Sequence, residues 1–285
     1  MNKYLFKYYY IGLDKYFGSQ RQNNVLTIED RVIKTLRNRG YIKNPKDSNF
    51  ESASRTDRYV SGRGAVFGIE SLKKPILMEL NSDLPEEIGI WSYAKVPNDF
   101  SPRFDAQMRH YKYIIPWPLD FLKEKHNFNW DLLKKACKDL EGTHDFQNFS
   151  KRDSLINNTV RDMKSINLSI KNNSIVIDFK SRAFLRQQIR RIVKKLIELA
   201  NREINYNEFL TLMNPSDFKS FQPANPKGLI LWNIEYSREI VDFKIDEKSL
   251  ERMNKFFFSR KMDSFLQYNL FSLMQKNELS DDDQF

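Results

Sequence analysis

The segment Ser54-Arg55-Thr56-Asp57-Arg58 places a carboxylate between guanidinium groups at the end of a predicted strand. In an extended chain, residues two apart project to the same face, so Arg55 and Asp57 are expected to lie side by side. The nearby cations favour the ionised form of the carboxylate. Such a carboxylate in a basic cleft suits nucleophilic or electrostatic catalysis on a polyanion. The spacing also fits a surface Arg–Asp pair of little consequence, which is the commoner case.

Two arginines on a predicted helix over residues 183–200 form a second candidate. Arg186 and Arg190 lie one turn apart on the flank of an apolar stripe that includes Leu185, Ile189, Ile192, Val193, Leu196 and Ile197. An arginine in this position is expected to be half-buried and to need a carboxylate partner. A basic amphipathic surface helix explains the same pattern equally well.

Two further segments suit contacts with RNA. Residues 141–150 have no clear periodicity and carry His144 and Phe146 among several hydrogen-bonding side chains, which favours a binding loop. Residues 109–113 alternate cations with aromatic rings on a predicted strand, so that Arg109, Tyr111 and Tyr113 share one face. That face is a plausible stacking surface, although core packing is the simpler explanation for Tyr113.

The composition narrows the range of partners. Lys and Arg number 47 against 37 Asp and Glu, a formal net charge of +10. Such an excess favours nucleic acid first and an anionic membrane second. No apolar run approaches the roughly 18 residues of a membrane span. Lys7 and Asp14 interrupt the N-terminal apolar region, which argues against a signal peptide. We therefore expect a cytoplasmic protein that does not act at a membrane.

Residues that bind metals or nucleotides are scarce. Cys137 is the single cysteine, and His110, His126 and His144 stand outside any zinc pattern. An internal disulfide, a multi-cysteine metal site and a zinc-dependent deaminase are thereby excluded. The chain also lacks the G-x-x-x-x-G-K-[ST] sequence of P-loop NTPases. An RNA enzyme of this composition is expected to work without a metal or cofactor.

The elements that must position these residues repeat in order. Thr27 and Asp30 form a capping-box pattern ahead of a helix that ends at Gly40. The first set is predicted as strand 3–11, helix 28–40, strands 50–57 and 64–70, helix 74–81 and strand 88–96. The second is predicted as strand 109–116, helix 129–140, a hairpin over 163–181 that turns at Asn172-Asn173, helix 183–200 and strand 229–236.

This order, β-α-β-β-α-β twice, predicts an α+β fold of two tandem ferredoxin-like units with antiparallel sheets and a basic cleft between them. The expected domains are residues 1–105, which carry Asp57, and residues 106–240. Residues 241–285 are predicted as an appended helical pair with an acidic end at residues 281–283.

Eight segments, in chain order over residues 3–236, resemble motifs of the TruA family of tRNA pseudouridine synthases. These segments are Gly18–Gln22, Ser54–Asp57, Phe100–Ala106, Arg109–Tyr113, Glu141–Ser150, Val160-Arg161, Ala183–Val193 and Asn225–Leu229. One difference lies beside the aspartate, where Arg58-Tyr59-Val60-Ser61 has Tyr59 in place of the glycine of the family pattern.

The resemblance implies that the chain isomerises uridine to pseudouridine in the anticodon stem-loop of tRNA, at tRNA positions 38, 39 or 40. The enzyme would flip out the uridine, break its N1–C1′ bond and rejoin the base through C5, with no cofactor and no metal. Asp57 would be the catalytic carboxylate, Tyr111 would lie against the base, and Arg190 would pair with Asp57. Whether Asp57 attacks C1′ or C6, or deprotonates the sugar, stays open.

The resemblance also implies the pseudouridine synthase fold, a homodimer and a set of RNA contacts. Arg55 would fill the gap left by the flipped nucleotide, and the other RNA-binding residues would be Arg58, Arg21, Gln22, His144, Phe146 and Arg186. Two other functions remain open: a non-catalytic tRNA-binding protein on the same fold, disabled by the altered loop at Tyr59, and a metal-independent ribonuclease.

Overall fold

The computed structural model describes residues 1–125, 128–152, 158–216 and 218–275. The strands are β1 (Asn2–Tyr10), β2 (Glu51–Ser52), β3 (Ser61–Ser71), β4 (Ile88–Val96), β5 (Met108–Pro118), β6 (Gly142–Asp145), β7 (Val160–Lys171), β8 (Ser174–Ser181), β9 (Leu229–Glu235) and β10 (Lys244–Ile245). The helices are α1 (Ile28–Asn38), α2 (Leu77–Asp83), α3 (Leu119–Lys125), α4 (Trp130–Asp139), α5 (Gln188–Ala200), α6 (Tyr206–Thr211), the 3₁₀ helix η1 (Pro226–Gly228) and α7 (Glu247–Met274).

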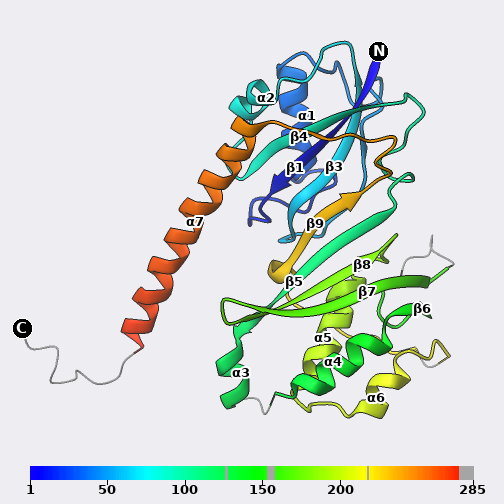
Figure 1. The fold of residues 1–285 in the computed structure, drawn as a ribbon, viewed down its shortest axis with the longest axis vertical. Helices are drawn as coiled ribbons and strands as arrows, with labels where there is room; N and C mark the ends of the chain where they lie inside the picture. Colours follow the sequence, from blue (N-terminus) through cyan, green and yellow to red (C-terminus); the bar gives the residue numbers. More distant parts are fainter. Residues whose placement is uncertain (126–127, 153–157, 217, 276–285) are drawn as a thin grey trace, which may run out of the picture.

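All these strands belong to one 10-stranded sheet with the order β10-β4-β1-β3-β9-β5-β8-β7-β6, with β2 paired to β3 beside this path (Figure 1). The prediction of two separate sheets is therefore wrong. The last strand of the second half, β9, pairs in parallel with β3 at Ser61 and Gly62 and so joins the halves. The other pairs between these strands are antiparallel.

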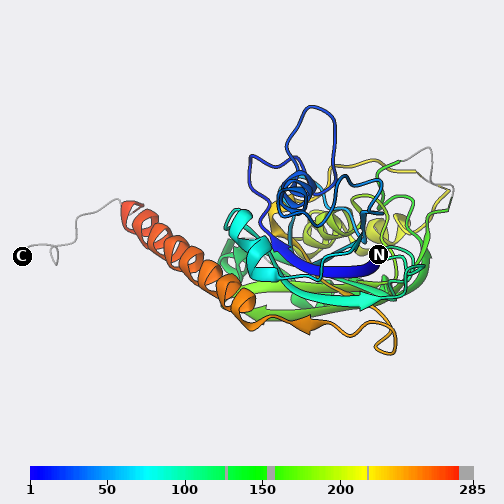
Figure 2. The ribbon, with the colours of Figure 1, turned by 90° about the horizontal axis from the view of Figure 1, so that it is seen from above.

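Several predicted elements form for the expected local reasons. The capping box of α1 is confirmed, since the Thr27 hydroxyl accepts from the Asp30 amide while the Asp30 carboxylate accepts from the Thr27 amide. The hairpin turn is confirmed as well: Asn172 and Asn173 both have positive φ, as a two-residue type I′ turn requires. Helices α1 and α5 lie on the same face of the sheet (Figure 2), and the main core includes Tyr8, Leu36 and Ile192.

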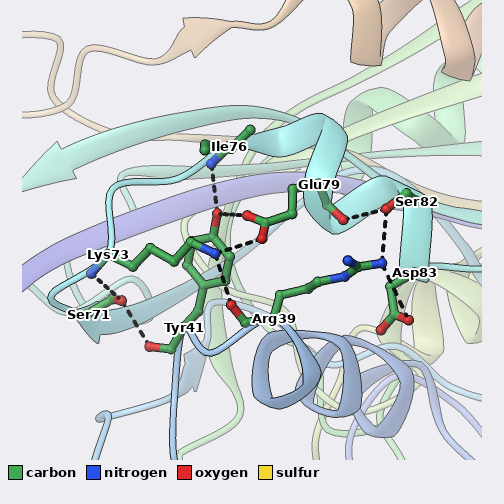
Figure 3. Close-up of polar contacts among 8 residues, drawn as sticks. All are labelled: Arg39, Tyr41, Ser71, Lys73, Ile76, Glu79, Ser82 and Asp83. Atoms are coloured by element: carbon green, nitrogen blue, oxygen red, sulfur yellow. Dashed lines mark hydrogen bonds and ion pairs between the residues drawn. The ribbon is translucent and has the colours of Figure 1, made fainter.

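The predicted helix 74–81 is displaced toward the C-terminus. The residue before Pro75 is disfavoured from helical geometry, and the helix begins only at Leu77. A polar network joins this segment to Tyr41, which follows α1 (Figure 3). The Tyr41 hydroxyl accepts from the Ile76 amide at 3.0 Å and donates to Glu79 at 2.8 Å. Lys73 also donates to Glu79, at 2.7 Å.

Within residues 241–275 the structure has one helix, α7, where a helical pair was predicted, and the predicted acidic end at residues 281–283 lies outside the described residues. Strand β10 extends the sheet beside β4, and the first turns of α7 pack Met253 and Phe256 against Tyr9 and Trp91. Beyond these turns α7 projects away from the rest of the molecule (Figures 1 and 2). The apolar side chains on this projecting part are exposed, among them Phe258, Phe265, Leu266 and Leu273.

Candidate active site

Asp57 lies in a loop rather than at the end of a long strand. Strand β2 ends at Ser52, and Asp57 begins a turn in which its carbonyl accepts from the Val60 amide at 3.2 Å. Tyr59, the third residue of the turn, has φ +68°, whereas Arg58 is not among the residues with positive φ. This is the pattern of a type II turn, in which glycine is favoured at the third position. A non-glycine residue in left-handed geometry costs about 1–2 kcal/mol.

Segment 12–19 packs directly on the backbone of this loop. A Cβ on Gly12 would lie 2.3 Å from the Tyr59 carbonyl carbon, and one on Gly18, whose φ is +99°, would lie 2.9 Å from the Thr56 oxygen. Ser19 completes the contact: its hydroxyl accepts from the Thr56 amide at 2.8 Å, and its amide donates to the Thr56 carbonyl at 3.1 Å. Segment 12–19 therefore holds the Asp57 loop in place.

Arg190 and Asp57 form the expected ion pair. Nη1 of Arg190 donates to Oδ2 of Asp57 at 2.8 Å, and Nε donates to the Ala224 carbonyl at 2.8 Å. The two side chains of the pair are 10% and 34% exposed, respectively. Among the described residues, no hydrogen bond reaches Oδ1 of Asp57. The guanidinium thus fixes one carboxylate oxygen and leaves the other available to a bound molecule.

Tyr111 lies on β5, 7% exposed, and its ring forms a T-shaped contact with the ring of Phe184 at a centroid distance of 5.2 Å. Burial raises the pKa of its hydroxyl to about 12, although the nearby Arg109 acts in the opposite direction. The side chain is therefore a neutral phenol near neutral pH, able to donate or accept a hydrogen bond. Tyr10, whose hydroxyl bonds the Thr56 hydroxyl at 2.8 Å, also has its pKa raised by burial.

Sequence reasoning missed the structural role of Arg109, which it assigned to a stacking surface. The guanidinium donates to the Ser54 hydroxyl at 2.9 Å and to the carbonyls of Ala53 and Arg103 at 2.8 Å each, and it also bonds the Arg182 carbonyl. It therefore ties the segment before Asp57 to the start of the second half. The sequence signal for this role was the position of Arg109, two residues before Tyr111 on the same face of the strand.

The predicted RNA-contact residues of the first half lie around this loop. Arg55, Arg21 and Gln22 are exposed, and Gln22 donates to the Phe17 carbonyl at 2.6 Å. Arg21 also lines an open groove of about 1450 Å³ along α1, together with Lys34, Arg37 and Lys43. Arg58 is held in place: it donates to the Asp14 carbonyl at 2.9 Å and lies 4.0 Å from the Phe17 ring centroid.

The second half departs further from expectation. Helix α5 begins at Gln188, after Gln187 with φ +61°, so Arg186 is exposed ahead of the helix and not one turn before Arg190 on its flank. The expected structureless loop contains strand β6, paired with β7. Phe146 is 1% exposed in the core, which does not fit a contact with RNA, and half-buried His144 bonds the Glu141 carbonyl at 2.7 Å.

The structure offers no metal cluster of the usual kind within its described ranges: no group of three or more His, Cys, Asp or Glu side chains is placed to hold an ion. Within those same ranges, no helix has the length and apolar character needed to cross a membrane.

Comparison with known proteins gives a consistent result. Residues 136–237 match a family model described as tRNA pseudouridine synthase. A tRNA pseudouridine synthase A of Pyrococcus furiosus is 36% identical over 247 residues, 85% of this chain and 86% of that protein. One of Archaeoglobus fulgidus is 33% identical over 283 residues, 98% of this chain and 100% of that protein. One of Methanothermobacter thermautotrophicus is 29% identical over 276 residues, 97% of this chain and 94% of that protein.

Proposed function

We infer the detailed function from the premise that this chain belongs to the tRNA pseudouridine synthase A family and is an isomerase that acts on tRNA. We propose that it converts uridine to pseudouridine in the anticodon stem-loop, at tRNA position 38, 39 or 40. Of the three functions that the sequence left open, the membership supports the enzyme over the non-catalytic binding protein and the ribonuclease.

The observation that carries the proposal is the asymmetry of the Asp57 carboxylate. Oδ2 accepts from the guanidinium of Arg190 at 2.8 Å, while Oδ1 has no hydrogen-bond partner among the described residues. The guanidinium aims the carboxylate, as a group that acts on a ribose or a base requires. Asp57 is the catalytic carboxylate in this proposal, and Arg190 acts through it.

The reaction needs no co-reactant. The N1–C1′ bond breaks and the C5–C1′ bond forms, while C5 loses a proton and N1 gains one, so the atoms of the nucleotide are conserved. In this proposal Tyr111 lies against the base, and its neutral phenol, or a water bound to it, assists removal of the C5 proton. The exposed Arg55 fills the space that the flipped nucleotide leaves in the RNA.

The fold is consistent with this function. We interpret the orders β4-β1-β3-β2 and β9-β5-β8-β7 as two ferredoxin-like units, in domains 1–105 and 106–240. The Arg190–Asp57 pair joins these units, and the RNA would bind across that junction, in the predicted basic cleft. A homodimer is part of the proposal, and sedimentation equilibrium tests it.

Release of tritium tests the function. A tRNA labelled with tritium at uridine C5 loses the label only when the base is rejoined through that carbon. We expect release by this protein without shortening of the RNA, and we expect it to disappear when the reacting uridine among positions 38, 39 and 40 is replaced by cytidine. Release that persists when all three are replaced would refute the positional assignment, and chain cleavage would support the ribonuclease.

A further inference from the structure

Tyr59 is an unexpected residue for the place that it occupies. It follows Asp57 by two positions and takes φ +68° in a turn whose third residue is favoured as glycine. Residues held in such geometry, when they are bulky, cluster at functional sites. The question is what the ring of Tyr59 does that a glycine would not.

The ring lies in a row of aromatic and cationic side chains beside Asp57. The Arg58 guanidinium is 4.7 Å from the Tyr59 ring centroid, and the Lys227 ammonium is 5.5 Å from it. Arg58 also contacts a second aromatic ring: its guanidinium lies 4.0 Å from the ring centroid of Phe17, a residue that is 39% exposed. Lys227 belongs to η1, two residues after the Asn225 carbonyl that accepts from Tyr113, so the row links the Asp57 turn to the second half.

Stability does not explain the ring, because its cation–π contacts to Arg58 and Lys227 lie near the surface, where such contacts are weak, while its backbone is strained. Tyr59 is only partly buried, and within the described residues its hydroxyl forms no hydrogen bond and its ring packs on no other aromatic ring. Glycine would form the same turn without strain, and the contact between Gly12 and the backbone of residue 59 would remain. Arg58 is held by Asp14 and Phe17 independently of the ring.

We propose that the ring of Tyr59 is a stacking surface for a nucleobase of the substrate RNA adjacent to the reacting uridine. This inference rests on the proposed function. Aromatic rings flanked by cations bind unpaired bases through the ring face while the cations meet the phosphates. Lys227 is exposed, and its ammonium lies near the distance limit for a cation–π contact with Tyr59. The ammonium can therefore leave the ring for a phosphate when a base stacks on the ring. Tyr59 is then a positioning residue that holds the RNA open while Asp57 reacts.

Three substitutions at Tyr59 and one control at Arg202 separate this role from a structural one. Tyr59→Gly and Tyr59→Asn remove the ring and relieve the strain, so we expect a Tm equal to or above that of the wild type and a single-turnover rate at saturating enzyme about tenfold or more lower. Tyr59→Phe keeps the ring and is expected to keep the rate within about twofold. Arg202→Gly relieves the same kind of strain after α5, where φ is +60°, and should leave the rate unchanged. A rate that stays at the wild-type value in Tyr59→Gly, or that falls as far in Tyr59→Phe, would overturn the proposal.

The RNA supplies an independent test through binding. With 2-aminopurine placed on either side of the reacting position, we expect wild-type and Tyr59→Phe proteins to quench its fluorescence at one of the two places, and Tyr59→Gly to quench less. Equal quenching by all three proteins would overturn the proposal. This readout needs no turnover, so a wild-type protein that binds and quenches but releases no tritium would refute the proposed function and not the stacking.

Discussion

Replacing Arg190 removes a guanidinium that holds the two halves of the site together. In Arg190→Ala, Asp57 loses its hydrogen bond at 2.8 Å and the Ala224 carbonyl loses its own at 2.8 Å. A hydrogen bond to a charged group contributes about 1.5–3 kcal/mol. Because Asp57 is 34% exposed, water replaces part of the lost contact. We therefore expect the free energy of unfolding to fall by about 2–4 kcal/mol, which is about 1 kcal/mol less than the loss for a fully buried pair.

The effect on the reaction should be larger than the effect on binding. Loss of one charge-assisted hydrogen bond that aims the carboxylate predicts a rate about 10- to 150-fold lower, at about 1.4 kcal/mol for each factor of ten. Arg190→Lys keeps the positive charge, but an ammonium cannot replace a guanidinium that bonds both Asp57 and Ala224. The rate of Arg190→Lys should therefore lie between those of the wild type and Arg190→Ala. The assay is single turnover of tRNA at saturating enzyme, with urea unfolding of each variant alongside.

Arg191 is the matched control on the same helix. It is buried like Arg190, and it donates to the Phe221 carbonyl at 2.7 Å rather than to Asp57. Arg191→Ala should therefore lower the free energy of unfolding comparably and leave the rate within about twofold. If Arg190→Ala and Arg191→Ala slowed the reaction equally, the loss would follow stability alone and the aiming role of Arg190 would be refuted.

Three further outcomes are expected. Arg21→Ala should weaken tRNA binding and reduce the slope of log affinity against log salt by about one, since it removes the proposed contact of Arg21 with one phosphate; an unchanged slope would remove Arg21 from the RNA interface. Tyr111→Phe should bind tRNA within about twofold of the wild type but react at least about tenfold more slowly, and normal turnover would leave Tyr111 as a stacking platform only. Burial raises the pKa of Tyr113 to about 12, so the folded chain keeps this proton after the unfolded chain loses it near pH 10. This group should then lower the free energy of unfolding by about 1.4 kcal/mol per pH unit between about pH 10 and 12. Urea unfolding should show a smaller loss of stability over this range in Tyr113→Phe than in the wild type, and equal losses would contradict the raised pKa of Tyr113.

Local patterns in the sequence predicted the elements that local chemistry determines. Thr27 and Asp30 cap α1 as expected, and Asn172 and Asn173 form the turn between β7 and β8, because caps and tight turns depend on residues a few positions apart. The start of α5 at Gln188 was missed because the left-handed Gln187 has no signature of its own in the sequence. A single sheet was missed because the pairing of β9 with β3 depends on residues more than 160 positions apart.

The candidate site was predicted in part for the same reasons. The expected position of Arg190 beside an apolar stripe indicated that it needs an anion, and the structure supplies Asp57. Phe146 was mistaken for a binding residue because a ring in an aperiodic segment looks the same whether it faces RNA or the core. The roles of Arg109 and Gly12 depend on backbone groups that they contact across the chain. The sequence shows Arg109 on the same strand face as Tyr111, but it does not show which carbonyls the guanidinium reaches.

We propose that the carboxylate of Asp57 carries out the isomerisation. Its most direct test is tritium release from tRNA labelled at uridine C5 by Asp57→Ala and wild-type proteins, each prepared free of any other pseudouridine synthase, with the Kd for tRNA measured alongside. We expect no release above background by the variant and a Kd within a few-fold of the wild type, because affinity comes mainly from Lys and Arg contacts to phosphate. Measurable turnover by Asp57→Ala would contradict the account.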